Sequence, residues 1–112
     1  MPRDDMFVVM YKILSYLYSC EKKGEKPLPS LLTGEGDLLH INEAYFANII
    51  EEMVDEGLVK GFQILKTWSG TKDVVTNDPR ITIKGVEFLQ ENSMMKKVAK
   101  ALKDAKDILP FI

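Results

Sequence analysis

Side chains that commonly catalyse reactions or bind metals are scarce in this chain. It contains one histidine, His40, and one cysteine, Cys20, so composition excludes a metal site built from several His and Cys ligands. The glycine-containing run at 33–36 is shorter than a phosphate-binding loop and carries Glu35 where a phosphate would lie. We expect Cys20 to be a small buried side chain, and we predict no catalytic centre, no cofactor and no metal. An enzyme that uses only Asp and Glu is the alternative left open.

Other side chains have the chemistry of DNA recognition. A predicted helix begins near Asn42, and the N-terminal half of such a helix enters the major groove in winged-helix proteins. Asparagine can pair with adenine through two hydrogen bonds, and lysine or arginine neutralises phosphates. The candidate DNA contacts are Asn42, Tyr45 and Asn48 on this helix, together with Lys66, Trp68, Lys72 and Arg80 in the segment that follows.

The same helix also favours a protein partner. It carries no Lys or Arg, and its carboxylates repel phosphates. The candidate residues of a protein-binding face are Glu43, Glu51, Glu52 and Asp55. Two further alternatives stay open in the following segment: its cations protect a strand edge or bind phosphates, and Trp68 is either an exposed contact or a core side chain.

Periodicity and turn residues place these side chains on five elements. Asn42 is expected to cap the second helix, and Gly57 to end it. A short extended stretch at 39–41 precedes that helix, and the strand-forming residues after Gly57 predict a hairpin with turns at 67–70 and 77–79. The expected elements are a first helix at 5–21, a recognition-type helix at 42–56, a wing at 58–83, and C-terminal helices at 84–92 and 94–109.

Length and composition favour a single domain over residues 1–112. Hydrophobic residues make up 46% and charged residues 29%, which is the ordinary mixture of globular proteins. No secretory signal or membrane-spanning run is visible, so we expect a cytoplasmic protein. The net charge is −2, but residues 27–59 hold no Lys or Arg, whereas ten basic and six acidic residues follow from Lys60 onward. Charge is therefore distributed unevenly along the chain.

The last predicted helix is strongly amphipathic. Its apolar arc runs from Met94 through Val98 to Leu109, and lysines dominate the opposite arc. Three roles fit such a helix: packing on the first helix to close the core, homodimerisation, and lying on a membrane surface. Asp104 and Asp107 among the lysines disfavour the membrane, so we expect no membrane partner.

Three segments resemble the YjcQ family, small winged-helix proteins of Gram-positive bacterial chromosomes and prophages. They are YKIL at 11–14, EGLVKG at 56–61 and ITIKGVEFLQENS at 81–93, with a lysine-rich helix following the last. The most specific part runs from Thr82 to Asn92. The resemblance implies a winged-helix fold, and it brings no catalytic or binding residues with it.

These observations predict an α+β, mostly α, winged helix-turn-helix domain with a C-terminal amphipathic helix. The predicted function is binding, either to double-stranded DNA as a transcriptional regulator or, alternatively, to a protein partner without DNA binding. A basic patch uniting the wing with the terminal helix would favour DNA. A contiguous exposed apolar patch would favour a protein partner.

Overall fold

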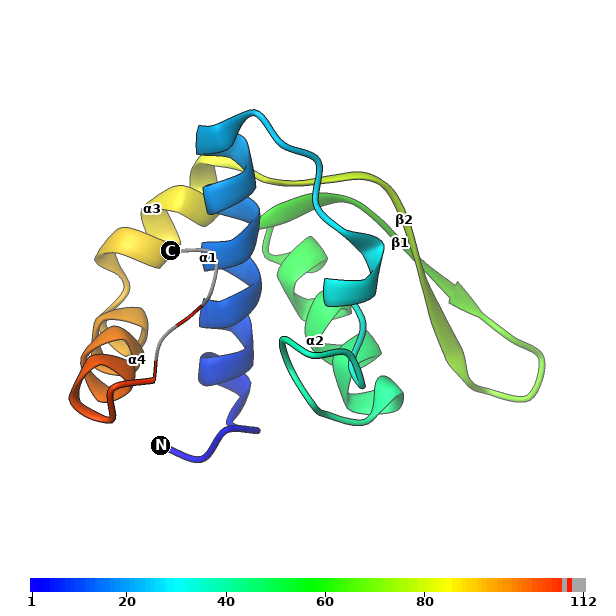
Figure 1. Ribbon diagram of the computed structural model, residues 1–112. Coiled ribbons are helices and arrows are strands. Elements are labelled where there is room, and N and C mark those ends of the chain that lie inside the picture. The colour runs from blue at the N-terminus through cyan, green and yellow to red at the C-terminus, as the bar shows by residue number, and fades with distance from the viewer. Residues whose placement is uncertain (108, 110–112) are drawn as a thin grey trace.

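The protein is described here by a computed structural model that covers residues 1–107 and 109. Within these residues the fold is α+β, with a winged-helix arrangement of helices and one hairpin (Figure 1). The helices and strands are α1 (Met6–Lys23), the single 3₁₀ turn η1 (Pro29–Leu31), α2 (Glu43–Asp55), β1 (Val59–Lys66), β2 (Lys72–Ile81), α3 (Ile83–Glu91) and α4 (Ser93–Asp104).

Helix α1 forms the centre of the core. Val9, Ile13 and Leu14 are completely buried, and even Lys12 is only 7% exposed. In Figure 1, α2 and the β1–β2 hairpin lie on one side of α1, while α3 and α4 lie on the other. A helix that is apolar on nearly every face needs neighbours on both sides, and this arrangement provides them.

Local capping defines the ends of the helices as the sequence predicts. The side chain of Asn42 accepts a hydrogen bond from the backbone N–H of Tyr45 at 2.8 Å, which satisfies a donor that the first turn of α2 leaves free. Gly57 follows α2 with a positive φ of 75°, a conformation that glycine adopts without a steric penalty. Asn92 caps α4 by accepting from the N–H groups of Met94 and Met95.

The hairpin is continuous from its base to its tip, which corrects the predicted second turn at 77–79. β2 runs through these residues from Lys72 to Ile81, and the register shifts between Lys60 and Phe62 of β1. The extra residues of β2 form a bulge opposite Gly61, which has a φ of 80°. The sequence Asn-Asp-Pro is typical of a turn, and Asp78 is locally left-handed with a φ of 53°. Pairing on both sides of the bulge nevertheless keeps the three residues within β2.

Two further predictions are wrong. The stretch at 39–41 is not extended: His40 has a φ of 54°, and the N–H of Ile41 donates to the carbonyl of Gly34 at 2.8 Å. The predicted helix at 94–109 ends as α4 at Asp104, because Lys106 turns left-handed and the N–H of Asp107 reaches back to the carbonyl of Leu102. This Schellman motif satisfies the last helical carbonyls. Residue 108 of that prediction lies outside the described residues.

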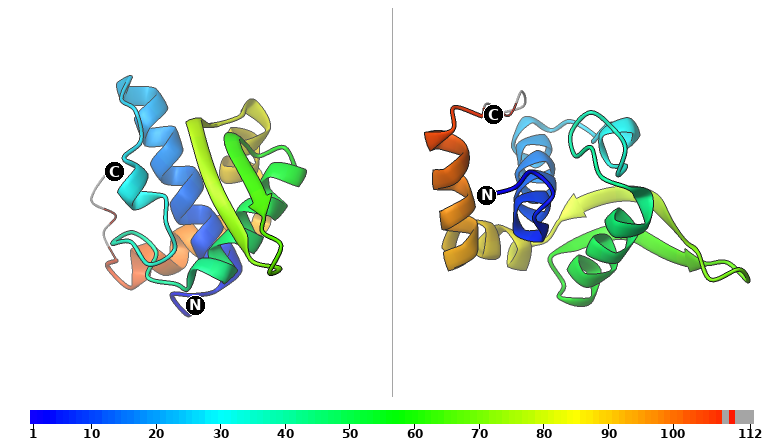
Figure 2. Two further views of the ribbon diagram at one scale, coloured as in Figure 1. Left: turned by 90° about the vertical axis from the view of Figure 1, so that its right-hand side faces the viewer. Right: turned by 90° about the horizontal axis from the view of Figure 1, so that it is seen from below.

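Helix α4 and the tip of the hairpin lie at opposite ends of the molecule (Figures 1 and 2). α4 packs on α1 through Met95 and Val98, both completely buried. The structure thus confirms one of the three roles predicted for this helix, packing on the first helix to close the core. The arrangement does not unite the cations of the wing and the terminal helix in one patch.

Candidate functional site

The hairpin presents two faces of different chemistry. Strand register pairs Lys66 with Lys72 and Ile64 with Val74, and alternate residues of a strand point to opposite sides. We call the side toward α2 the inner wing face, formed by Phe62, Ile64, Lys66, Lys72, Val74 and Thr76. The other side with the tip is the outer wing face, formed by Gln63, Leu65, Trp68, Asp73 and Val75.

Lys72 on the inner wing face is engaged with α2. Its ammonium lies 2.9 Å from a carboxylate oxygen of Glu51 and 3.0 Å from the amide oxygen of Asn48. The hydrogen bond and positive charge of Lys72 lower the pKa of Glu51, with a smaller contribution from Lys66. Two predicted DNA contacts, Asn48 and Lys72, therefore bind each other.

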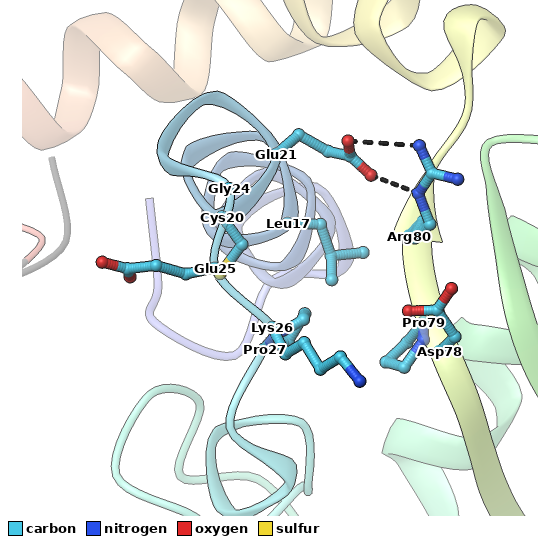
Figure 3. A pocket seen from close by; sticks show the side chains of 10 residues that line it. All are labelled: Leu17, Cys20, Glu21, Gly24, Glu25, Lys26, Pro27, Asp78, Pro79 and Arg80. Carbon is cyan, nitrogen blue, oxygen red and sulfur yellow. Dashed lines mark hydrogen bonds and ion pairs between the residues drawn. The ribbon is translucent and has the colours of Figure 1, made fainter.

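Arg80 is engaged in the same way at the base of the hairpin. Its guanidinium forms a bidentate pair with the carboxylate of Glu21 at the end of α1, with an Nη2–Oε2 distance of 3.2 Å (Figure 3). The pairing lowers the pKa of Glu21 and raises that of Arg80. The adjoining pocket has a volume of about 190 Å³, below the usual range for drug-sized ligands.

The front of α2 is also occupied by contacts within the chain. Asn42 caps the helix, and the hydroxyl of Tyr45 donates to the backbone carbonyl of Asp4 at 2.8 Å. Burial, with smaller effects of Asp5 and Asp4, raises the pKa of Tyr45. The three side chains predicted to read bases, Asn42, Tyr45 and Asn48, thus lie together at α2. The polar contacts described for each of them are with other residues of this chain.

The four acidic residues predicted as a partner face have separate environments. Glu43 accepts from the backbone N–H groups of Gly34 and Glu35 at 3.2 and 3.0 Å, and Glu51 binds Lys72. Glu52 and Asp55 are exposed and have no ion pair with any residue that the structure describes. This half of the predicted face remains available to a partner.

Trp68 is fully exposed at the tip of the hairpin, with a relative accessibility of 101%. This settles the alternative left open by the sequence in favour of a surface position. Leu65 and Val75, on the same outer wing face, are 44% and 42% exposed. The sequence reasoning missed these two residues, although strand alternation would have placed Leu65 on the side opposite Lys66.

Metal-binding side chains are dispersed over the described part of the chain. Among residues 1–107 and 109, no cluster of three or more His, Cys, Asp or Glu is placed to hold a metal ion. Cys20 is buried, and burial raises the pKa of its thiol, which disfavours the reactive thiolate. None of the described helices combines the length and apolar character required to cross a membrane.

Comparison with protein families identifies one match, to the family described as YjcQ protein, over residues 11–108. This segment includes every described helix and strand except the first turns of α1. The chain belongs to the YjcQ family. No curated protein and no solved structure matches it. The description of this YjcQ family names no ligand.

Proposed function

We propose that this YjcQ-family protein is a winged-helix binding module without a catalytic centre, and that it binds a protein partner through the outer wing face. The observation that carries this proposal is the full exposure of Trp68 at the hairpin tip. Tryptophan is enriched among the few residues that dominate binding energy at protein interfaces. Leu65 and Val75 add two exposed apolar side chains on the strands that lead to the tip.

The charge around the hairpin supports a protein partner over DNA. Phosphate binding depends mainly on lysine and arginine that are free to displace counterions. Lys72 and Arg80 instead bind Glu51 and Glu21, and α2 contributes no cation of its own. Glu52 and Asp55 leave an exposed negative surface on that helix, which would repel a phosphate backbone.

DNA-binding transcriptional regulation is the second candidate, and one specific observation favours it. Lys66 and Trp68 are both exposed near the hairpin tip, where a wing can meet the backbone or minor groove of DNA. The lysines of α4 are at the opposite end of the molecule (Figure 2), so a single short duplex would meet only one of the two cationic regions.

Two measurements on the full chain separate these candidates. In the first, a labelled random duplex is titrated with the protein at about 20 mM and about 150 mM salt, and fluorescence anisotropy is recorded. We expect no binding at either concentration. Binding that tightens as salt falls, and that weakens in Lys66→Ala and Trp68→Ala, would replace the protein partner with DNA.

The second measurement selects peptides from a random phage-displayed library on the wild-type protein. We expect enriched peptides whose binding is lost in Trp68→Ala and retained in Leu28→Ala. Leu28 is the matched control because it is also exposed, at 58%, but lies in the loop before η1. Enriched peptides that bind Trp68→Ala as well as wild type would refute the assignment of the outer wing face.

A further inference from the structure

A groove rimmed by carboxylates lies on the side of the fold formed by α3. It has a volume of about 370 Å³ and runs between the end of α2, the start of β1 and α3. Phe88, which is partly buried, supplies apolar surface, whereas Leu58 is only 2% exposed. The lining residues, which we call the acidic groove, are Glu56, Leu58, Lys84, Glu87, Phe88, Glu91 and Asn92.

The groove has a net negative charge, because three carboxylates and one lysine line it. Glu56, Glu87 and Glu91 are exposed, and no described Lys or Arg forms an ion pair with them. Lys84, the one cation of the groove, is three residues before Glu87 on α3 and about two helical turns from Glu91, and it forms no ion pair with either. Ile83, one turn before Glu87 on the same stripe of α3, is 82% exposed. The negative groove thus has the exposed apolar side chain of Ile83 beside it.

Helix α4 carries the complementary chemistry. Its apolar side chains Met95 and Val98 are buried within the chain, so the opposite face is turned to solvent. That face carries Lys96, Lys97, Lys100 and Lys103, all exposed. None of these lysines forms an ion pair within the part of the chain that the structure describes. Lys100 and Asp104, one turn apart on α4, are likewise not paired.

The spacing of the charges on the two helices is the same. Glu87 and Glu91 are four residues apart on α3, and Lys96 and Lys100 are four residues apart on α4, so each pair spans about 6 Å along its helix. A lysine side chain can lay its apolar stem on a hydrophobic surface while its ammonium reaches a carboxylate at the rim. The lysine face of α4 therefore fits the acidic groove in both charge and apolar contact.

We propose that two copies of this chain associate, with α4 of each copy seated on the acidic groove of the other. Asn92 lines the groove and also caps α4, so the two surfaces adjoin on each copy. A two-fold axis can then satisfy both contacts at once and close the assembly as a dimer. This surface is separate from the outer wing face, and the dimer does not depend on the function proposed above.

Sedimentation velocity of the full chain tests this dimer. We expect a dimer at about 20 mM salt that dissociates in about 0.5 M salt, because exposed ion pairs are screened. The groove variant Glu87→Lys with Glu91→Lys and the helix variant Lys96→Glu with Lys100→Glu should each be monomeric. Asp73→Lys, a charge reversal on the outer wing face away from the groove, should leave the dimer intact.

Mixing the two double variants provides the decisive measurement. In the mixture, each contact again joins lysines to glutamates, so an equimolar mixture should form a heterodimer although neither variant self-associates. A monomeric wild-type chain at about 20 mM salt, a dimer that survives both reversals, or a mixture that remains monomeric would overturn the proposal. None of these results bears on peptide binding through Trp68.

Discussion

Lys66 and Lys72 face each other across the two strands, on the side of the hairpin toward α2. Like charges directly opposite on a sheet destabilise the pair. Glu51 offsets this repulsion, because it binds Lys72 directly and also interacts with Lys66. Lys72 thus holds the wing against α2.

The pKa of Glu51 provides a direct measure of this contact. Lys72 stabilises the ionised carboxylate and lowers its pKa below the ordinary 4.5. A lowered carboxyl pKa stabilises the fold above the pKa of the unfolded chain, and that stabilisation is lost as pH falls through the folded-state pKa. We predict that Lys72→Met raises the pKa of Glu51 toward 4.5, measured by carbon-detected NMR titration of the side chain.

Lys60→Met is the control for this titration. Lys60 lies at the base of the hairpin, where it acts on Glu21, so its loss should leave the titration of Glu51 unchanged. If the pKa of Glu51 is the same in Lys72→Met as in wild type, Lys72 does not bind Glu51 in solution.

The hairpin as an element depends on one glycine in its bulge. Gly61 has a φ of 80°, and a Cβ atom at this position would collide with the backbone carbonyls of Asn77 and Asp78. Gly70 in the tip also has a positive φ, of 89°, but a Cβ there would meet nothing within 4 Å. An alanine would be strained by the positive φ at either position. The two positions differ in the space available to its Cβ atom.

We therefore expect Gly61→Ala to destabilise the protein by about 2–4 kcal/mol, the sum of left-handed strain and overpacking. Gly70→Ala should cost about 1 kcal/mol, from the strain alone. Urea denaturation followed by circular dichroism measures both. Equal losses in the two variants would show that the bulge is not tightly closed.

At the scale of the whole molecule, the core extends from α2 and the hairpin through α1 to α4. Met95 of α4 is completely buried, whereas its neighbour Met94 is only partly buried. Removal of a fully buried methionine side chain leaves a cavity as well as losing apolar burial. The C-terminal helix is thus an integral part of the fold.

We predict that Met95→Ala lowers the free energy of unfolding by about 2–5 kcal/mol. Met94→Ala, which makes the same chemical change one residue earlier, should cost clearly less. Chemical denaturation of both variants gives the comparison. A smaller loss for Met95→Ala than for Met94→Ala would mean that α4 packs in a different rotation.

The sequence by itself determined the helices, several of their ends and the family. Caps such as Asn42 and Gly57 act within one turn of the chain, so neighbouring residues suffice to predict them. Apolar periodicity indicated a buried α1 for the same reason. It wrongly placed Met94, and not Met95, on the core side of α4. In a short helix, the apolar pattern alone does not distinguish two orientations that differ by one residue.

Only the tertiary structure decided what the candidate site residues contact. Lys72 meets Glu51 across 21 positions, and Arg80 meets Glu21 across 59, so no local pattern reports either pair. The face on which each hairpin side chain lies depends on register, which the bulge at Gly61 shifts. Register and packing between distant elements therefore placed Lys72 and Arg80 in internal contacts and left Lys66, Trp68, Leu65 and Val75 on the surface.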